Sequence, residues 1–130
     1  KNIQMTCVAD GKALDFLNPM DICSIFGNAL DNAITSAEKM ENPEKRLIHV
    51  TVSQEKSFLR IKIENSFQGV LKMKNQLPIT TKEDRLYHGF GLKSMKEIAE
   101  KYKGSLTVSA KDGWFELRIL IPLPEDEKII

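Results

Sequence analysis

The central stretch of this sequence reads Asp21-Ile-Cys-Ser-Ile-Phe-Gly-Asn-Ala-Leu-Asp-Asn-Ala33. Within it and just beyond it, apolar residues recur at spacings of four, four, three and four, which is the period of one helix face. These residues are Ile22, Phe26, Leu30, Ala33 and Ala37. Asp21 stands where an N-cap is expected, and Asn42-Pro43 interrupts the pattern. We therefore expect a helix from Asp21 to about Met40.

The polar residues of this helix form a second line. At 100° per residue they gather on the face opposite the apolar stripe. They are Asp21, Ser24, Asn28, Asn32 and Thr35. Two asparagines in mid-helix are unusual, because asparagine prefers caps and turns. The line is either a solvated helix face or a cation site, since an amide oxygen can coordinate Mg²⁺.

Segments on both sides of this helix alternate between apolar and polar residues, which is the pattern of strands with one buried face. The alternation covers residues 3–9, 47–53 and 58–64. A short polar turn separates the last two segments, so we expect them to form a hairpin.

A second helix and a second hairpin complete the pattern. The helix begins after Gly89-Phe90-Gly91 and stops at Gly104, a good C-cap residue. Its apolar face comprises Leu92, Met95, Ile98, Ala99 and Tyr102. Strands near 106–108 and 115–121 flank a turn at Asp112-Gly113. Residues 66–88 show no sustained period, and a loop of this length is typical of a lid, a binding loop or a disordered segment.

The order strand, helix, hairpin, loop, helix, hairpin predicts the α+β class. We expect a two-layer sandwich with a mainly antiparallel, mixed sheet and the helices on one face. Residues 1–130 fit a single domain, with a flexible tail at 125–130. The chain opens on Lys1 without an apolar leader, which suggests a piece of a longer protein.

Composition narrows the functional classes. Nineteen basic and 18 acidic residues give a net charge of +1, so charge favours neither nucleic acid nor a membrane surface as partner. Cys7 and Cys23 are too few for a disulfide framework, which fits a reducing, cytoplasmic setting. The longest apolar runs are too short to span a bilayer.

Two further features concern phosphate and base recognition. The stretch His88-Gly-Phe-Gly-Leu-Lys-Ser-Met95 places two glycines before a helix start, where free N–H groups and the helix dipole can hold phosphate oxygens. No P-loop pattern is present in the sequence. Asn65 follows the strand 58–64 at the mouth of the long loop, a place that also suits a simple turn residue.

Taken in this order, the pieces resemble the GHKL or Bergerat-fold ATPases. The closest likeness is to the catalytic ATP-binding domain of sensor histidine kinases, of the peptide- or quorum-sensing type. Asp21 to Ala33 resembles the N box of that family, and His88 to Met95 resembles its second glycine box. The resemblance runs from Asp21 to Pro122, and it implies the Bergerat fold with ATP and Mg²⁺ as cofactors.

The resemblance also implies roles for particular residues. Asn32 would supply its amide oxygen to Mg²⁺, and Asn65 would accept a hydrogen bond from the adenine amino group, where most relatives carry aspartate. Backbone N–H groups would contact the phosphates from Gly89, Gly91 and Leu92. Lys39 and Lys93 are candidate phosphate contacts, and residues 66–88 would form the ATP lid.

By the resemblance, Asn28 lies at the position that is catalytic in this family, and it would also contact ATP. Relatives that hydrolyse ATP carry a glutamate there, whereas an amide cannot act as a general base. We therefore expect slow hydrolysis and transfer of the γ-phosphoryl group to a histidine on a separate dimerisation domain. His49 and His88 are interpreted as structural or lid residues, so the acceptor histidine is expected outside this chain.

The resemblance implies further partners and leaves two alternatives open. A response regulator would act downstream, and the chain would be the cytoplasmic domain of a membrane-bound sensor, with no direct contact to membrane or nucleic acid.

However, the sequence departs from the family pattern at two places. The first glycine box reads Asn65-Ser-Phe-Gln-Gly69 with a single glycine, and Thr35 stands where many of these kinases have a basic residue. The alternatives are a degenerate, non-catalytic interaction domain of this fold and a serine kinase of the anti-sigma-factor type.

Overall fold

A computed structural model describes residues 2–68, 73–74, 77–78 and 90–124. Its main sheet has five strands in the order β1-β2-β3-β7-β6. The strands are β1 (Gln4–Ala9), β2 (Leu47–Glu55), β3 (Phe58–Ser66), β7 (Trp114–Pro122) and β6 (Ser105–Lys111). β1 runs parallel to β2, and the other neighbours are antiparallel.

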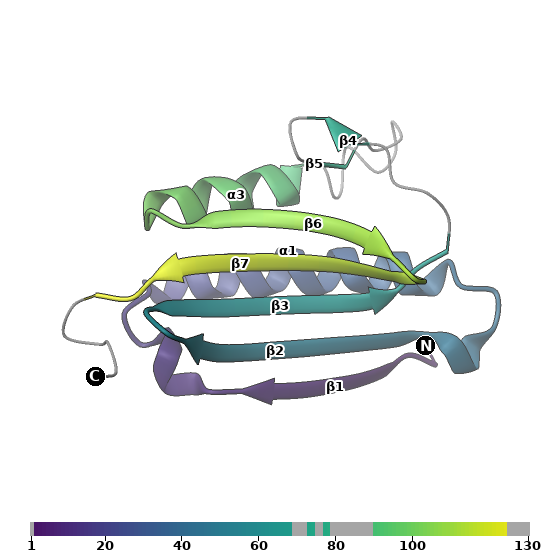
Figure 1. The fold of residues 1–130 in the computed structure, drawn as a ribbon. Helices are drawn as coiled ribbons and strands as arrows, with labels where there is room; N and C mark the ends of the chain where they lie inside the picture. Colours follow the sequence, from purple (N-terminus) through teal and green to yellow (C-terminus); the bar gives the residue numbers. More distant parts are fainter. Residues whose placement is uncertain (1, 69–72, 75–76, 79–89, 125–130) are drawn as a thin grey trace.

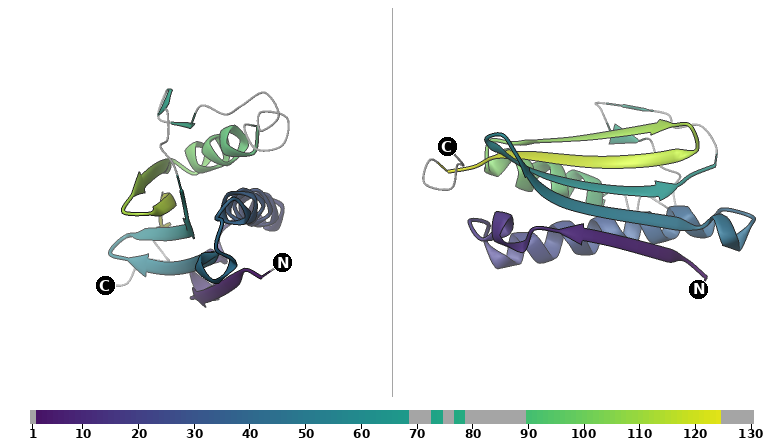
Figure 2. Two further views of the ribbon diagram at one scale, coloured as in Figure 1. Left: turned by 90° about the vertical axis from the view of Figure 1, so that its right-hand side faces the viewer. Right: turned by 60° about the horizontal axis from the view of Figure 1, so that its bottom comes forward.

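In the described part of the chain, two α-helices pack on one face of this sheet and leave the other face uncovered (Figures 1 and 2). They are α1 (Pro19–Glu38) and α3 (Phe90–Lys101). Short 3-10 helices, η1 (Gly11–Leu14) and η2 (Pro43–Lys45), flank α1. The predicted α+β, two-layer architecture with a mixed sheet is therefore confirmed. Within the described residues, no helix is both long and apolar enough to cross a membrane.

The core lies between the helices and the central strands. Alternate residues of β2, β3 and β7 point toward the helices and are buried, as the alternation predicted. They are Ile48, Val50, Val52, Leu59, Ile61, Ile63, Phe115, Leu117, Ile119 and Ile121. The predicted turn between β6 and β7 is also confirmed, because Asp112 and Gly113 both adopt positive φ, at 54° and 82°.

The first helix begins earlier than expected. Asn18, not Asp21, is its N-cap, because the Asn18 side chain accepts a hydrogen bond from Met20 N at 2.8 Å. Pro19 fits the first helical position, where its missing N–H has no cost. The fully buried stripe also differs from the prediction, since it comprises Ile25, Ala29, Ala33 and Ala37. The small alanines allow the helix to lie close to the sheet, while the larger Ile22, Phe26 and Leu30 are only partly buried beside it.

The first strand exists where the alternation predicted it, but its predicted burial is wrong. Every residue of β1 is exposed, including Met5 and Val8. The reason is its place at the edge of the sheet, because α1 packs mainly over β3 and β2 and does not extend over β1.

Gly104 follows the second helix as predicted, but it is glycine for a different reason than the predicted C-cap. Lys103, not Gly104, takes the left-handed conformation at φ 65°, and Gly104 N donates to Ala99 O at 2.8 Å. A Cβ on Gly104 would lie 2.2 Å from the carbonyl oxygen of Leu120 on β7. Glycine is required there for close approach of the chain to the sheet rather than for its own φ.

The expected loop at 66–88 is only partly described. Ser66 still belongs to β3, and Phe67 N donates to Gly113 O at 2.8 Å. Two strands of two residues each, β4 (Met73–Lys74) and β5 (Leu77–Pro78), pair as a separate small sheet that is too short to show a sequence period. The other residues of the predicted lid, with His88 and Gly89, lie outside the described residues, as does the tail 125–130.

Candidate functional site

The candidate site lies where α1 passes the start of α3. The two helices are antiparallel neighbours, because the first turn of α1 contacts the end of α3 while Asn28 contacts Gly91. The sequence predicted that the line of polar residues on α1 lies opposite the apolar stripe. In the structure the line is not opposite the fully buried stripe. It lies about 120° from that stripe at 100° per residue, on the side that faces α3. Ser24, Asn28 and Asn32 are all half-buried there.

Asn28 joins the two predicted motifs. Its side-chain Nδ2 donates to Ser24 O at 2.8 Å and lies 3.3 Å from Ser24 Oγ. The amide nitrogen is thus turned back along α1, and the amide oxygen lies toward α3. A Cβ on Gly91 would lie 3.0 Å from Asn28 Oδ1, so the asparagine fills the space that the glycine leaves. The close packing of Asn28 against Gly91 accounts for a glycine at this position.

The residues at the start of α3 offer backbone groups. The first N–H groups of a helix have no partner within it, and the dipole makes this end attractive to anions. Leu92 is 2% exposed, so its side chain belongs to the core and only its N–H can serve a ligand. Lys93 is exposed in the same turn, whereas Lys39 lies at the C-cap of α1, about three turns beyond Asn28 at 3.6 residues per turn.

Asn32 lies one helical turn beyond Asn28 on the same side of α1. Since α3 begins beside Asn28, Asn32 extends past the first residues of α3 and borders the space in front of its N-terminus. The Asn32 side chain and the first N–H groups of α3, which have no partner within the helix, therefore lie at the same end of the α1–α3 contact. This pairing can hold a cation and an anion together.

Asn65 is a buried polar residue close to the end of β3. It is 1% exposed and shares the helix-facing side of the strand with Ile61 and Ile63. Its Nδ2 donates to Ser66 O at 2.8 Å, while its buried Oδ1 has no partner among the described residues. One of the two N–H groups of its Nδ2 is engaged with Ser66, and its Oδ1 can accept a hydrogen bond from a ligand with an N–H group.

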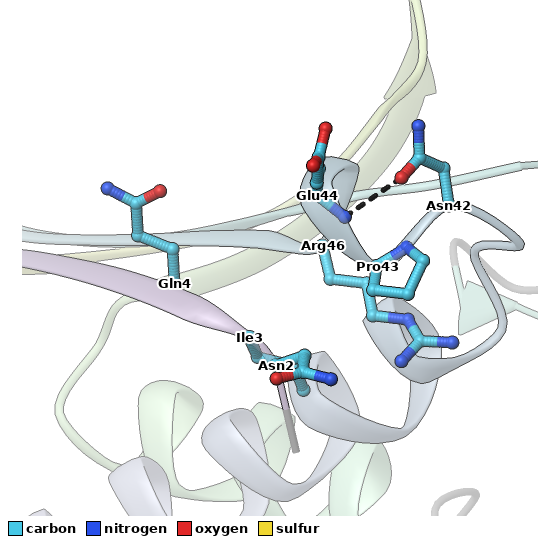
Figure 3. A pocket seen from close by; sticks show the side chains of 7 residues that line it. All are labelled: Asn2, Ile3, Gln4, Asn42, Pro43, Glu44 and Arg46. Carbon is cyan, nitrogen blue, oxygen red and sulfur yellow. Dashed lines mark hydrogen bonds between the residues drawn. The ribbon is translucent and has the colours of Figure 1, made fainter.

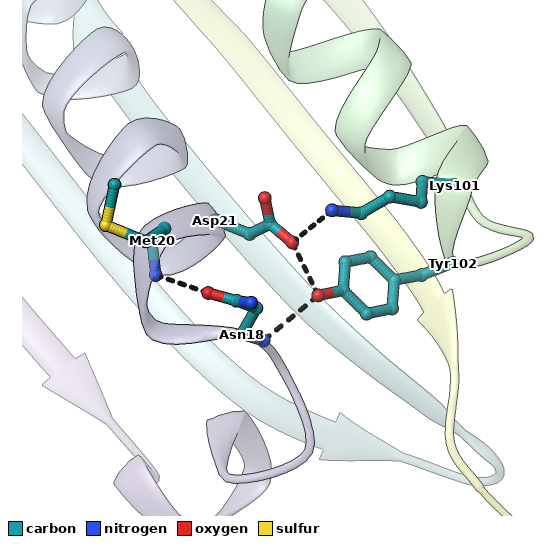
Figure 4. Close-up of polar contacts among 5 residues, drawn as sticks. All are labelled: Asn18, Met20, Asp21, Lys101 and Tyr102. Carbon is teal, nitrogen blue, oxygen red and sulfur yellow. Dashed lines mark hydrogen bonds and ion pairs between the residues drawn. The ribbon is translucent and has the colours of Figure 1, made fainter.

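A second polar cluster connects the opposite ends of the helices. Tyr102 OH donates to Asp21 Oδ2 at 2.5 Å and accepts from Asn18 N at 3.0 Å, and Lys101 Nζ lies 2.6 Å from the same carboxylate oxygen (Figure 4). We call Asn18, Asp21, Lys101 and Tyr102 the helix-end cluster. The hydrogen bond from Lys101, followed by that from Tyr102, holds the pKa of Asp21 below its ordinary value, and Asp21 raises the pKa of Lys101.

Sequence reasoning missed this cluster. It assigned Asp21 to the N-cap and Tyr102 to the apolar face, and the partners lie 80 and 81 residues apart. The available signal was the lysine-tyrosine pair at the end of the second helix, opposite an acidic residue at the start of the first. Sequence alone does not show that these helices are antiparallel neighbours.

Other features lie apart from these residues. A pocket of about 720 Å³ opens between the start of β1 and η2, where Asn42 caps Glu44 N (Figure 3). It is lined by Asn2, Ile3, Gln4, Asn42, Pro43, Glu44 and Arg46, none of which was predicted as a site residue. His49 stacks on Trp114 with ring centroids 4.9 Å apart, which agrees with its interpretation as a structural residue.

Solved structures with the same fold include a catalytic domain and other parts of histidine kinases. That of the kinase ThkA matches with a TM-score of 0.69 and 22% identity, covering 95% of this chain and 82% of that one. The histidine kinase domain of the blue-light activated kinase EL346 from Erythrobacter litoralis gives 0.65 and 16%, covering 94% and 52%. Histidine kinase AdeS from Acinetobacter baumannii gives 0.62 and 18%, covering 95% and 56%. This chain therefore spans about half the length of the last two.

These likenesses define the fold as that of histidine kinase catalytic domains. A family model described as a GHKL domain matches residues 17–122. The chain belongs to the GHKL domain family, as its motifs indicated. The comparison with curated protein sequences finds no match.

Proposed function

We propose that this chain is the ATP-binding catalytic domain of a sensor histidine kinase. The observation that carries the proposal is the packing of Asn28 against Gly91, which joins the N box to the second glycine box. The buried Oδ1 of Asn65, which has no partner among the described residues, adds an acceptor suited to the amino group of adenine. The residues present fit an adenine nucleotide with its magnesium ion.

Each residue has a distinct part in this proposal. Asn32 supplies an amide oxygen to Mg²⁺, and Asn65 accepts from the adenine amino group. Backbone N–H groups of Gly89, Gly91 and Leu92 bind phosphate oxygens at the start of α3, and Lys93 adds positive charge in the same turn. Lys39 lies about three turns beyond Asn28 and could only approach the phosphates from the far end of α1. Asn28 orients the glycine turn and contacts the nucleotide from the catalytic position.

Catalysis by such a site is mainly positioning and charge neutralisation. The bound magnesium ion would neutralise charge on the phosphates. Asn28 offers an amide where a general base would be needed to activate water, so the site protects the γ-phosphoryl group from hydrolysis. The acceptor is then a histidine on a separate helical dimerisation domain, and a response regulator receives the phosphoryl group from it.

The likeness of the N box to peptide- or quorum-sensing kinases supports a parent protein of that type. In such a parent this domain lies on the cytoplasmic side of a membrane-bound sensor. Dimerisation occurs through the domain that carries the acceptor histidine.

Phosphorylation of the full-length protein tests this function. With γ-labelled ATP and Mg²⁺, we expect acid-labile, base-stable phosphate on a histidine, and we expect Asn32→Ala to abolish it while the variant stays folded. Acid-stable phosphate on a serine of a partner protein would instead identify the anti-sigma-factor type of kinase. Absence of any phosphate, together with no binding of a non-hydrolysable ATP analogue, would identify a degenerate interaction domain.

A further inference from the structure

The two ends of α3 are held very differently. At its C-terminal end, the hydroxyl of Tyr102 bonds to both the N-cap residue and the first turn of α1. The same ring packs edge-on against Phe16, with centroids 6.2 Å apart. Gly104 then brings the following chain against the Leu120 carbonyl of β7. This end of α3 is therefore fixed to both α1 and the sheet.

The N-terminal end of α3 is held by packing among the described residues. Leu92 is buried in the core, and Gly91 lies against the Asn28 side chain. There is no room for a larger residue at this point, since a Cβ on Gly91 would be only 3.0 Å from Oδ1. A shift of α3 along α1 would change the packing of Gly91 against Asn28, because packed interiors transmit small shifts.

The helix itself is a rigid connection between these ends. Gly91 and Lys101 are ten residues apart, which is about 15 Å along a helix. The fixed end thus determines where the free N–H groups of the first turn lie relative to Asn28 and Asn32.

We propose that Tyr102 is a positioning residue, whose hydroxyl holds α3 in the register along α1 that places the Gly91 turn against Asn28. Tyr102 touches neither the nucleotide nor the metal. It acts through Asp21 and Asn18 on α1 and through the length of α3. The inference rests on the proposed function for its effect on nucleotide binding, but its structural part stands apart from that function.

Nuclear magnetic resonance on this chain tests the structural part directly. Tyr102→Phe removes one oxygen and keeps the ring, so an effect about 15 Å away reports movement of the helix rather than a local change. We expect changed signals for the Gly91 N–H and the Asn28 side-chain amide. Asp21→Ala removes the other half of the link and is expected to shift the same signals, whereas Asp21→Asn keeps an acceptor for Tyr102 and is expected to shift them less.

Calorimetric titration with a non-hydrolysable ATP analogue and Mg²⁺ tests the functional part. We expect Tyr102→Phe to weaken binding by about threefold to tenfold. Val52→Ala, in the buried face of β2, is the matched control, since it lowers stability without touching α3. We expect it to leave the affinity unchanged.

The outcomes separate the two proposals. Unchanged signals at Gly91 and Asn28 with unchanged affinity in Tyr102→Phe would overturn the positioning role, and so would an equal loss of affinity in Val52→Ala. If the wild-type chain binds no nucleotide while Tyr102→Phe still shifts the Gly91 and Asn28 signals, the proposed function fails and the positioning role is supported.

Discussion

Asn65 shows how a single residue can oppose stability and serve a site. Its Oδ1 is buried without a partner among the described residues, and leaving a buried acceptor unsatisfied costs about 1–3 kcal/mol. Its neighbours on the same side of β3 are apolar residues that fill the core. A residue of this kind is expected where a ligand completes the hydrogen bond.

We predict that Asn65→Leu abolishes nucleotide binding while leaving the free protein as stable or more stable, by up to about 1–2 kcal/mol. The gain comes from burying an apolar side chain and removing the unsatisfied oxygen, and the lost bond to Ser66 O offsets part of it. Denaturant unfolding and calorimetric titration measure the two effects. A large loss of stability would show that Asn65 serves the fold rather than a ligand.

Most of the site residues could be proposed from sequence, but their environment could not. Asn28 and Asn32 were identified by their spacing on one helix and by the family motif. The bond of Asn28 to Ser24, and its packing against Gly91, depend on the angle between two helices that are distant in sequence. The lack of a partner for Asn65 Oδ1 within the described residues likewise depends on the burial of its strand, which the sequence does not show.

At the scale of the elements, two glycines in or beside helices have opposite roles. Gly27 lies inside α1, and a Cβ added there would meet no described atom within 4 Å, whereas Gly104 lies against the Leu120 carbonyl. The first has no steric need to be glycine. The second is required by close approach to β7.

We therefore predict opposite effects for the same substitution. Gly27→Ala is expected to stabilise the protein by about 0.5–1 kcal/mol, because alanine has the better helix propensity. Gly104→Ala is expected to destabilise it by about 1–3 kcal/mol through the clash with β7. Thermal unfolding of both variants checks this pair, and equal effects would contradict the described path of the chain after α3.

The ion pair in the helix-end cluster predicts a pH dependence. Because folding lowers the pKa of Asp21 from 3.8, its contribution is present above pH 3.8 and is lost as the pH falls through the lower folded value. Because folding raises the pKa of Lys101 from 10.5, that contribution is present below pH 10.5 and is lost as the pH rises through the higher folded value.

We expect the stability difference between the wild-type protein and Asp21→Asn to be constant from about pH 5 to 9 and to shrink at either extreme. Urea unfolding across this range measures it. Lys101→Met is the control, because it removes the alkaline change and leaves the hydrogen bond from Tyr102 to Asp21 in place. A difference that stays flat or grows as the pH falls below 3.8 would mean that Asp21 is not paired in the folded state.

Element types were largely predictable, while their surroundings were less so. Alternation identified both hairpins, since the strands are half-buried and the period of two is plain. It failed for the burial of β1, because burial depends on which strands α1 covers. The N-cap was misplaced by three residues, because Asp21 and Asn18 are both capable caps and Pro19 obscured the start.

For the molecule as a whole, one end of the α1–α3 pair is assigned to a nucleotide site and the other end to its support. The uncovered face of the sheet takes no part in either. That face carries ion pairs between Lys62 and Glu64 and between Arg118 and Glu116, at 3.6 Å and 3.2 Å. Residues on this face therefore serve as internal controls, because a ligand that binds between α1 and α3 should not change their signals.

The most direct test is a heteronuclear NMR titration of this chain with a non-hydrolysable ATP analogue and Mg²⁺. We predict saturable changes in the side-chain amides of Asn28, Asn32 and Asn65 and in the backbone amides of Gly91 and Leu92, all lost in Asn32→Ala. No saturable change, or changes confined to the uncovered sheet face around Lys62 and Arg118, would contradict a nucleotide site between α1 and α3.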